Sequence, residues 1–318
     1  MGLKANQELL ESEVDEPTIV TVGMFDGVHL GHKYLLDRLK SESKERNLSP
    51  AVLTFRSHPQ SILRPNNQVP LITSLQDRLS LISNEDIKFL VPLTFDYHLS
   101  LVGARSFVEM LKNTINMKGF LVGPDFALGH KREGTIPMLT TLGKDVGFFV
   151  SVLDVLELEG NSVRSTSVRN SIKDGNMELS SQLLGRPHSF SAKVVHGEGR
   201  GRDLGFPTAN LVFDTSLIIP HDGVYATWIE INGRYMISAT SIGYNPTFNK
   251  GNSTVETFIL GFDSDIYDTN VRLAFGPRIR DMEPFPSKEE LIKQMHDDVS
   301  QVASLLKSFP LQPYSFIF

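Results

Sequence analysis

Residues 18–32 read TIVTVGMFDGVHLGH, an apolar run followed by ten residues that hold three glycines, two histidines and one aspartate. The short β-branched run predicts a buried strand, and the glycines after it predict a tight turn. A helical pattern begins at about Gly31, because apolar residues recur three and four positions apart through Leu35, Leu36 and Leu39. This strand–turn–helix unit predicts the start of an α/β domain.

The same alternation continues to about residue 155. Further strands are predicted at 51–55, 88–91, 120–123 and 148–152, and helices lie between them. Two of the helices open with a Ser-x-x-acid capping box, Ser74–Asp77 and Ser106–Glu109. The alternation indicates a doubly wound parallel sheet, whose ligands lie beyond the carboxyl ends of the strands. The glycine-rich turn is predicted at that end of the first strand.

After residue 187 the pattern changes. A helical segment at about 166–184 ends at Gly185-Arg186-Pro187, which marks a domain boundary. Beyond it the apolar residues alternate, and Asn232-Gly233 predicts a hairpin with a type I′ turn. We therefore expect an antiparallel barrel or sandwich, followed by a last helix that opens at the capping box Ser287–Glu290. The predicted organisation is a polar, loose segment at 1–16, an α/β domain at 17–186 and a mainly β domain at 187–318.

Composition limits the function. The 318 residues carry a net charge of −6, which is not the basic balance of a nucleic-acid binder. There is no cysteine, so disulfides, thiolate zinc sites and cysteine nucleophiles are excluded. No apolar run approaches the ~20 residues of a membrane span. We expect a cytoplasmic protein without a nucleic-acid or membrane partner, and the oligomeric state stays open.

Three explanations compete for His29 and His32. The two side chains pack a turn, bind a metal or bind phosphate. Metal binding is the weakest, since no third ligand lies nearby in the sequence. Phosphate fits the free N–H groups and positive dipole end of a helix that begins near Gly31. The residues alone leave the packed turn and the phosphate site equally open.

Two further stretches of the first half suit a ligand. Arg164-Ser165-Thr166-Ser167-Val168-Arg169 is a second helix start with hydroxyls and arginines, either an anion site or an ordinary N-cap with a solvated arginine. Asp125 follows the predicted strand 120–123 and either orients a substrate or forms an Asx turn.

The second half has its own candidate site. Residues 197–210, GEGRGRDLGFPTAN, form either an anion-binding nest reinforced by arginines or a flexible surface loop. Thr208 and Asn210 lie two apart on a predicted strand, so their oxygens share a face that suits Mg²⁺ held with nucleotide phosphates. Glu256 shares a face with Phe258, Leu260 and Phe262. A carboxylate there is either functional or a strand-end side chain that reaches solvent.

In their order along one chain, these motifs resemble the bacterial bifunctional riboflavin kinase/FMN adenylyltransferase (FAD synthetase) family. The resemblance covers about residues 17–307. The matching segments are G-x-F-D-G-V-H-x-G-H at 23–32, T-F-x-x-H-P at 54–59, G-x-D-F-x-x-G at 123–129, S-T-x-h-R at 165–169 and G-R-G-x-x-L-G-F-P-T-A-N at 199–210.

The resemblance implies a Rossmann-like nucleotidyltransferase domain followed by a β-barrel riboflavin kinase domain. It implies that riboflavin, ATP and FMN are substrates, that FMN and FAD are products, and that Mg²⁺ is the metal. In the first domain it implies His29 and His32 as catalytic ATP-phosphate contacts, His58 and Asp125 on the FMN or nucleotide side, and an ATP-binding set of Gly23, Phe25, Asp26, Gly31, Ser165, Thr166 and Arg169.

In the second domain the resemblance implies Glu256 as the catalytic base and Thr208 and Asn210 as metal and ATP ligands. Gly199, Gly201 and Arg202 would bind the ATP phosphates, and Arg280 would lie on the flavin side. The chain departs from the family twice, since many members have serine where it has Arg164 and some have asparagine where it has Asp125. Two rival hypotheses remain: only one half is active, or the protein is a flavin- or nucleotide-binding sensor.

Overall fold

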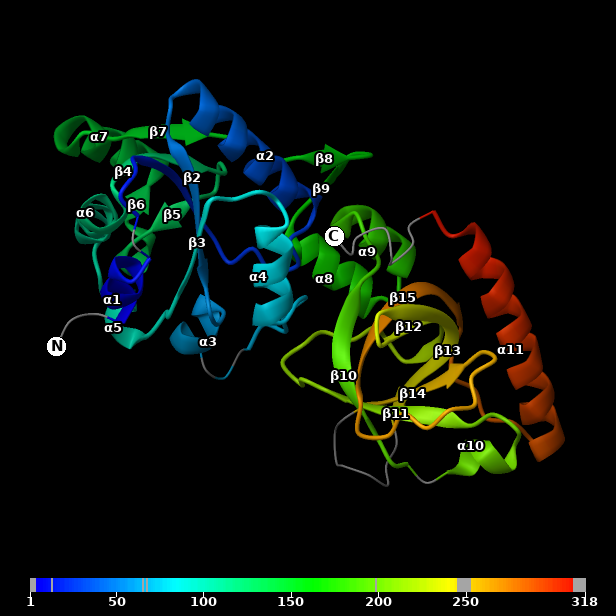
Figure 1. Ribbon diagram of the computed structural model, residues 1–318. Coiled ribbons are helices and arrows are strands. Elements are labelled where there is room, and N and C mark those ends of the chain that lie inside the picture. Colours follow the sequence, from blue (N-terminus) through cyan, green and yellow to red (C-terminus); the bar gives the residue numbers. More distant parts are fainter. Residues whose placement is uncertain are drawn as a thin grey trace. The chain divides into compact units, whose positions relative to one another are not determined.

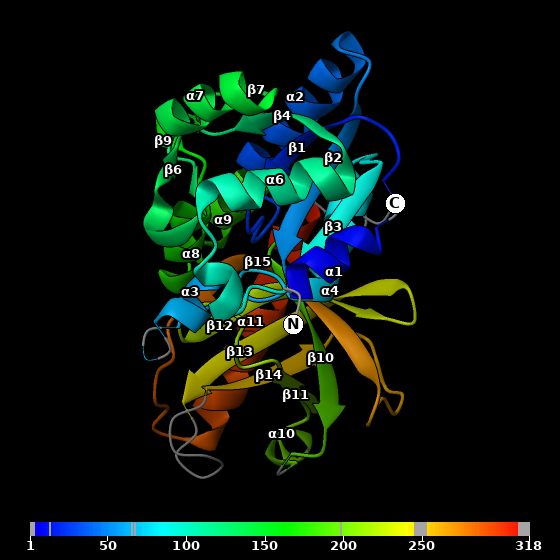
Figure 2. The same cartoon turned by 90° about the vertical axis from the view of Figure 1, so that its left-hand side faces the viewer.

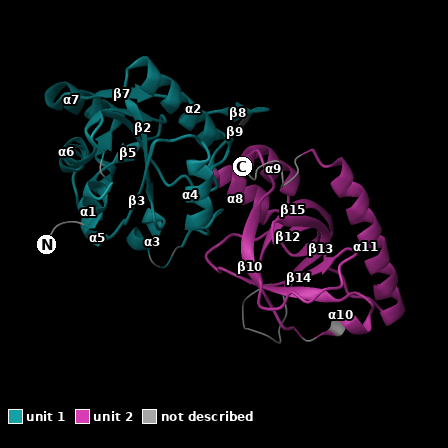
Figure 3. Cartoon of the chain, in the orientation of Figure 1, with its two compact units in different colours: residues 1–164 teal, residues 165–318 magenta. Residues whose placement is uncertain are grey.

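The computed structural model describes residues 4–12, 14–64, 66, 68–197, 199–244 and 253–310. The chain forms two compact units, residues 1–164 and residues 165–318 (Figure 3). The predicted domain boundary, at 186/187, differs from this division in one respect: it assigns the helical segment after Arg164 to the first domain.

The first unit contains a five-stranded sheet in the order β3-β2-β1-β4-β7, with every neighbouring pair parallel. The strands are β1 (Thr18–Val22), β2 (Ser49–Phe55), β3 (Phe89–Leu93), β4 (Met117–Val122) and β7 (Phe149–Val152). The chain builds outward from β1 to β3 and then returns to place β4 on the other side of β1. The point where the winding reverses therefore lies between β1 and β4, and a doubly wound sheet binds its ligands there. The predicted doubly wound fold is confirmed.

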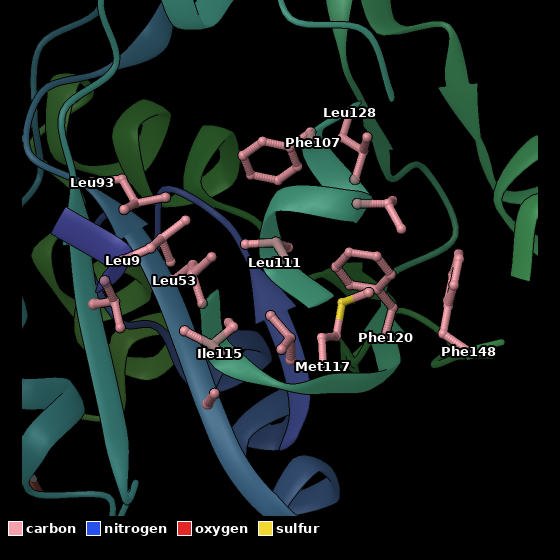
Figure 4. Packing of buried hydrophobic residues seen from close by; sticks show 14 of the residues in the cluster. Leu9, Leu53, Leu93, Phe107, Leu111, Ile115, Met117, Phe120, Leu128 and Phe148 are labelled. Carbon is pink, nitrogen blue, oxygen red and sulfur yellow. The ribbon is translucent and has the colours of Figure 1, made fainter. Parts of the chain in front are cut away.

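Helices cover both faces of this sheet (Figure 1). Alternate strand residues point to opposite faces, so Ile19 packs with α2 (Leu30–Glu45) and α4 (Leu75–Ser83), whereas Val20 packs with α6 (Ala104–Ile115). Figure 2 shows α6 lying across the strands. Figure 4 shows the packing on that face, where Phe107 and Leu111 of α6 meet Leu53 of β2 and Phe120 of β4. The remaining short elements are α3 (Pro59–Leu63), α5 (Tyr97–Ser100), β5 (Ala127–Leu128), η1 (His130–Arg132), β6 (Gly134–Thr135), α7 (Ile136–Val146), β8 (Glu157–Leu158) and β9 (Asn161–Ser162).

One of the two predicted capping boxes in this unit is correct. Ser74 Oγ accepts the backbone N–H of Asp77 at 3.1 Å, at the start of α4. The box at Ser106 is wrong, because α6 begins two residues earlier, at Ala104. The Glu133 carboxylate, distant in sequence, accepts the Ala104 N–H at 2.8 Å and replaces the local cap.

The expectation of a loose start is also wrong. Residues Lys4–Leu10 form α1, in which Ala5 and Leu9 are buried in the core beside β3 and α6. The Glu8 carboxylate accepts from the backbone N–H and the hydroxyl of Thr94 at 2.6 and 2.8 Å, and from Arg56 Nε at 3.0 Å. These contacts tie α1 to the residues that follow β2 and β3.

The second unit begins with two helices, α8 (Ser165–Lys173) and α9 (Met177–Leu184), where the sequence predicted one helix at 166–184. The break falls at Gly175, which has a φ of +72°. A Cβ at Gly175 would lie 2.8 Å from the Tyr225 hydroxyl, so the turn packs directly on the barrel strand that carries Tyr225. Asn176 then caps α9 by accepting the Leu179 N–H at 3.0 Å.

The rest of this unit is a closed antiparallel barrel in the strand order β10-β11-β14-β13-β12-β15. The sequence was compatible with either a barrel or a sandwich. The pairing of β10 with β15 closes the sheet and shows that it is a barrel. Asn232 and Gly233 both have positive φ, 51° and 80°, which confirms the type I′ hairpin. The elements are β10 (Ser189–Val195), α10 (Arg200–Asp203), β11 (Thr208–Phe213), β12 (Gly223–Ile231), β13 (Arg234–Tyr244), β14 (Ser253–Ile259), β15 (Asn270–Arg280) and α11 (Lys288–Ser308).

Helix α11 lies along the outside of the barrel (Figure 1). Its predicted capping box is confirmed, since Ser287 Oγ accepts the Glu290 N–H at 3.2 Å. Val302 and Leu306 are buried against Trp228 of β12. No helix in the described part of the chain is long and apolar enough to cross a membrane.

Candidate active sites

The turn at 23–32 leaves the central strand β1 at the switch point. It is compact, with positive φ at Phe25 (51°), Gly27 (85°) and Val28 (38°). Positive φ is unfavourable for residues with side chains, and here the burial of Phe25 and Val28 offsets that strain. A Cβ at Gly23 would lie 3.1 Å from the Phe25 ring, so this glycine lets the ring fold back over the strand end.

Asp26 holds this turn to the segment before α4. Its carboxylate is buried and accepts the N–H groups of Ile72 at 2.9 Å and Thr73 at 3.1 Å. Thr73 Oγ1 in turn accepts the Gly27 N–H at 3.1 Å. The structure thus gives Asp26 a part in shaping the turn, and the contact with ATP expected from the family resemblance stays a prediction.

Sequence reasoning missed Arg78, a fully buried arginine of α4. One of its Nη atoms donates to the Phe55 carbonyl at 2.5 Å and the other lies 3.5 Å from Met24 Sδ. Burial lowers the pKa of Arg78, while the negative charge of Asp26 acts in the opposite direction. The available signal was its position, because Arg78 shares the apolar face of α4 with Leu75 and Ile82.

His29 and His32 lie together at the start of α2. Their rings stack, with centroids 3.7 Å apart, and Phe25 packs against His32 at 5.0 Å. His29 is the N-cap residue, and its Nδ1 accepts the His32 N–H at 3.2 Å. The proton of the neutral His29 ring therefore lies on Nε2, which is a hydrogen-bond donor suited to an anion. The packed turn and the anion site, which the sequence left as alternatives, are compatible in one structure.

Gly31 permits a close approach of another segment. A Cβ at this position would lie 2.6 Å from the carbonyl oxygen of Val163, the residue that follows β9. The backbone at 163 therefore packs directly on the first turn of α2. The next residue is Arg164, and its Nη1 lies 2.5 Å from the Asp125 carboxylate.

Asp125 lies three residues beyond the end of β4, at the edge of the sheet where β1 also ends. Its carboxylate pairs with Arg164 rather than forming the Asx turn that was one expectation. His58 caps the short helix α3, where Nδ1 accepts the Gln60 N–H at 3.1 Å, beyond the end of β2. Both residues lie at the expected edge of the sheet, and their contacts with FMN or nucleotide stay predictions.

Ser165, Thr166 and Arg169 lie in the first turns of α8, as the sequence predicts for a helix start. This helix belongs to the second compact unit, whereas His29 and His32 belong to the first. The joint action of these residues with His29 and His32 therefore stays a prediction.

In the barrel the structure brings Thr208, Asn210 and Glu256 together. Asn210 of β11 is directly opposite Glu256 of β14 in the antiparallel ladder, so both side chains share the outer face. Thr208 Oγ1 lies 3.4 Å from Glu256 Oε2. Strand β14 ends at Ile259, so Phe258 shares this face within the strand, while Leu260 and Phe262 lie beyond it.

Glycines shape the loop beside these three residues. A Cβ at Gly197 would lie 2.1 Å from Asn210 Nδ2, and a Cβ at Gly201 would lie 2.3 Å from the Phe206 carbonyl. Gly199 has a φ of +73° and precedes α10, which contains Arg202. Glu198 and the side chain of Arg200 lie outside the described residues. The loop therefore lies close against the Thr208–Asn210 strand.

The donor set on this face suits a hard cation. It combines a hydroxyl, an amide and a carboxylate, and Mg²⁺ prefers oxygen ligands, some of them supplied by substrate phosphates. Among the described residues, no three His, Cys, Asp or Glu side chains are grouped closely enough to form a metal site by themselves. The binding of Mg²⁺ by Thr208 and Asn210 stays a prediction.

Arg280, expected on the flavin side, makes a two-pronged ion pair with Asp298 of α11. Nε and an Nη atom lie 2.9 and 2.8 Å from the two carboxylate oxygens, and Gln294 donates to the same carboxylate at 2.9 Å. Asp298 is buried, so the pair fastens α11 to β15. A flavin contact of Arg280 stays a prediction.

Comparison with known proteins gives two family matches in order along the chain. The model for FAD synthetase matches residues 11–167, and the model for riboflavin kinase matches residues 184–306. The crystal structure named "Macrolide-efflux Protein from Streptococcus pneumoniae" superposes with a TM-score of 0.86 at 29% identity, over 95% of this chain and 98% of that one. This likeness supports the fold of the chain.

Curated relatives cover almost the whole chain. The bifunctional riboflavin kinase/FMN adenylyltransferase of Buchnera aphidicola is 31% identical over 90% of this chain and 93% of its own length. Those of Bacillus subtilis and Escherichia coli K12 are each 31% identical over 91% of this chain, and over 92% and 93% of their own lengths. With both domain matches in the same order, the chain belongs to the bifunctional riboflavin kinase/FMN adenylyltransferase family.

Proposed function

We propose that the chain phosphorylates riboflavin to FMN at the barrel site and transfers AMP from a second ATP to FMN at the turn after β1. The observation that carries the proposal is that each of the two matched domains contains its own group of neighbouring polar side chains. These are His29 and His32 at the switch point and Thr208, Asn210 and Glu256 on the barrel. We assign residues 17–186 to the adenylyltransferase, because Ser165, Thr166 and Arg169 are part of its proposed site.

In the kinase reaction the 5′-hydroxyl of the ribityl chain attacks the γ-phosphorus of ATP. Its new P–O bond forms as the bond to ADP breaks, and Glu256 accepts the hydroxyl proton. Thr208 and Asn210 would hold Mg²⁺ together with the ATP phosphates, and Gly199, Gly201 and Arg202 would bind those phosphates. Bound Mg²⁺ would neutralise phosphate charge. Arg280, which pairs with Asp298 of α11, would also contact the flavin.

In the adenylyl transfer a phosphate oxygen of FMN attacks the α-phosphorus of ATP, and pyrophosphate leaves. No covalent enzyme intermediate is needed, so the protein contributes positioning and stabilisation of charge. His29 Nε2, His32 and the first turn of α2 at Gly31 would contact the ATP phosphates. Gly23, Phe25 and Asp26 hold the turn in shape, Ser165, Thr166 and Arg169 would hold the far phosphates, and His58 and Asp125 would lie on the FMN or nucleotide side.

The direct test is to give the purified protein riboflavin, ATP and Mg²⁺ and to follow FMN and FAD by chromatography. We expect FMN first and FAD after it. A sensor would make neither product, and a chain with one active half would stop at FMN or would need FMN supplied. Omission of Mg²⁺ should stop FMN formation. We also propose a cytoplasmic location, where ATP and riboflavin are both present.

A further inference from the structure

The ion pair between Arg164 and Asp125 spans the point where the sheet reverses its winding. Asp125 follows β4, and Arg164 follows the residue whose carbonyl packs on the first turn of α2, after β1. Since β1 and β4 are parallel neighbours, their carboxyl ends open side by side. The pair therefore bridges the two loops between which ligands of this fold bind.

Stability does not explain this pair. The Arg164 and Asp125 side chains are 48% and 70% exposed, and ion pairs this exposed contribute little to the free energy of unfolding. The positive charge of Arg164 balances the negative charge of Asp125. Asp125 therefore does not add an unbalanced negative charge beside a phosphate site.

The local charge favours an anion. Arg132 donates from an Nη atom to the backbone carbonyl of Asp125 at 2.9 Å, so a second guanidinium lies beside the Asp125 backbone, in addition to the Arg164 guanidinium that pairs with the carboxylate. Arg164 donates to the Asp125 carboxylate through Nη1. A guanidinium carries five N–H donors in a planar fork, which is more than one carboxylate oxygen can accept. The start of α2 adds the positive end of a helix dipole next to Val163.

We propose that Arg164 binds a phosphate group in the adenylyl-transfer site and that Asp125 is the positioning residue that holds its guanidinium across the switch point. The inference rests on the proposed function, and it adds Arg164, which immediately precedes the S-T-x-h-R segment at 165–169. The shared ligand chemistry is a phosphate oxygen, which comes from either ATP or FMN.

The test compares Arg164→Ala, Arg164→Lys, Asp125→Asn and the double variant Asp125→Asn/Arg164→Ala in adenylyl transfer from ATP to supplied FMN. A contact between a guanidinium and a phosphate predicts a loss of about tenfold or more in kcat/KM for Arg164→Ala. Lysine should recover part of it, because it keeps the charge but not the fork. If Asp125 acts through Arg164, Asp125→Asn should lower kcat/KM less than Arg164→Ala does. The double variant should then have the same kcat/KM as Arg164→Ala alone.

Arg105→Ala is the matched control, since Arg105 is an exposed arginine of the same unit that pairs with Asp145 at 3.4 Å. It should leave adenylyl transfer unchanged. Circular dichroism during urea unfolding of each preparation shows that the first unit is folded, and its rate of riboflavin phosphorylation shows that the barrel is. A rise in the KM for ATP or for FMN identifies which phosphate Arg164 contacts.

Calorimetric titration with inorganic pyrophosphate and, separately, with FMN tests the contact without turnover. Arg164→Ala should raise the Kd for one of these two ligands by about tenfold, whereas Arg105→Ala should leave both Kd values unchanged. Unchanged binding of both ligands together with an unchanged kcat/KM would overturn the proposal, as would equal losses in the Arg105 control. A wild-type protein that makes no FAD would refute the proposed function, whereas the titration would still decide the phosphate contact.

Discussion

His29 and His32 stack at the start of α2, and Nδ1 of His29 accepts the backbone N–H of His32. The His29 imidazole caps the helix through Nδ1, and the N–H of its Nε2 is the donor of the proposed phosphate contact. A substitution at His29 should change both helix stability and the proposed anion contact, whereas a substitution at His32 spares the cap. The two residues can therefore be tested separately.

Replacement of His32 by alanine should abolish FAD formation and leave FMN formation intact. Loss of one donor to the transition state typically costs about 10²–10³ in rate. Both products are measured by chromatography of one reaction with riboflavin, ATP and Mg²⁺. Equal loss of both activities would contradict a model with two separate sites.

His29→Asn and His29→Ala should lose adenylyl transfer equally but differ in stability. Asparagine is a favourable N-cap and alanine is not, so only the alanine variant should lose about 1 kcal/mol of unfolding free energy. Urea unfolding followed by circular dichroism measures the difference. If the asparagine variant kept the wild-type rate, His29 would be a cap residue and nothing more.

Glu256→Gln should block phosphorylation of riboflavin while supplied FMN is still converted to FAD, because glutamine cannot accept the proton of the hydroxyl. Glu230→Gln is the matched control, since Glu230 is also a partly exposed strand glutamate of the barrel, on β12. A normal kinase rate in Glu256→Gln would remove the residue from the role of base.

Asp26→Ala should destabilise the first unit by about 3 kcal/mol. It leaves two buried N–H groups without their acceptor and removes the negative charge near buried Arg78. The loss should be visible in circular dichroism during urea unfolding. The only tryptophan, Trp228, lies in the barrel, so its fluorescence reports the other unit. Asp37→Ala, at an exposed aspartate of α2, should change neither signal.

Glu8 predicts how the docking of α1 depends on pH. Burial raises the pKa of its carboxyl, but hydrogen bonds from Thr94 and Arg56 outweigh burial and leave the pKa below the usual 4.5. The stabilisation is therefore present above about pH 4.5 and is lost as the pH falls through the lower pKa of the folded state. The difference in unfolding free energy between wild type and Glu8→Gln should shrink below that pH. A difference that is independent of pH would show that the carboxylate charge contributes nothing.

Much of the architecture follows from local signals. The β-branched run at 18–22 and the glycines after it give the first strand and turn, and Asn232-Gly233 gives the hairpin, because these depend on propensities within a few residues. Where a distant group intervened, the local prediction failed. Glu133 caps α6 in place of Ser106, and Tyr225 packs against Gly175, where one predicted helix is in fact two.

The same division holds for the sites. The sequence by itself determined which residue types lie in each motif and their order, and hence the family, since motif spacing is a property of the chain. Only the tertiary structure placed Asn210 opposite Glu256, Arg78 in the core beneath the turn, and Arg164 against Asp125. Strand register, burial and ion pairing join residues that are tens of positions apart. They are decided by how the whole unit packs, and no window of the sequence contains them.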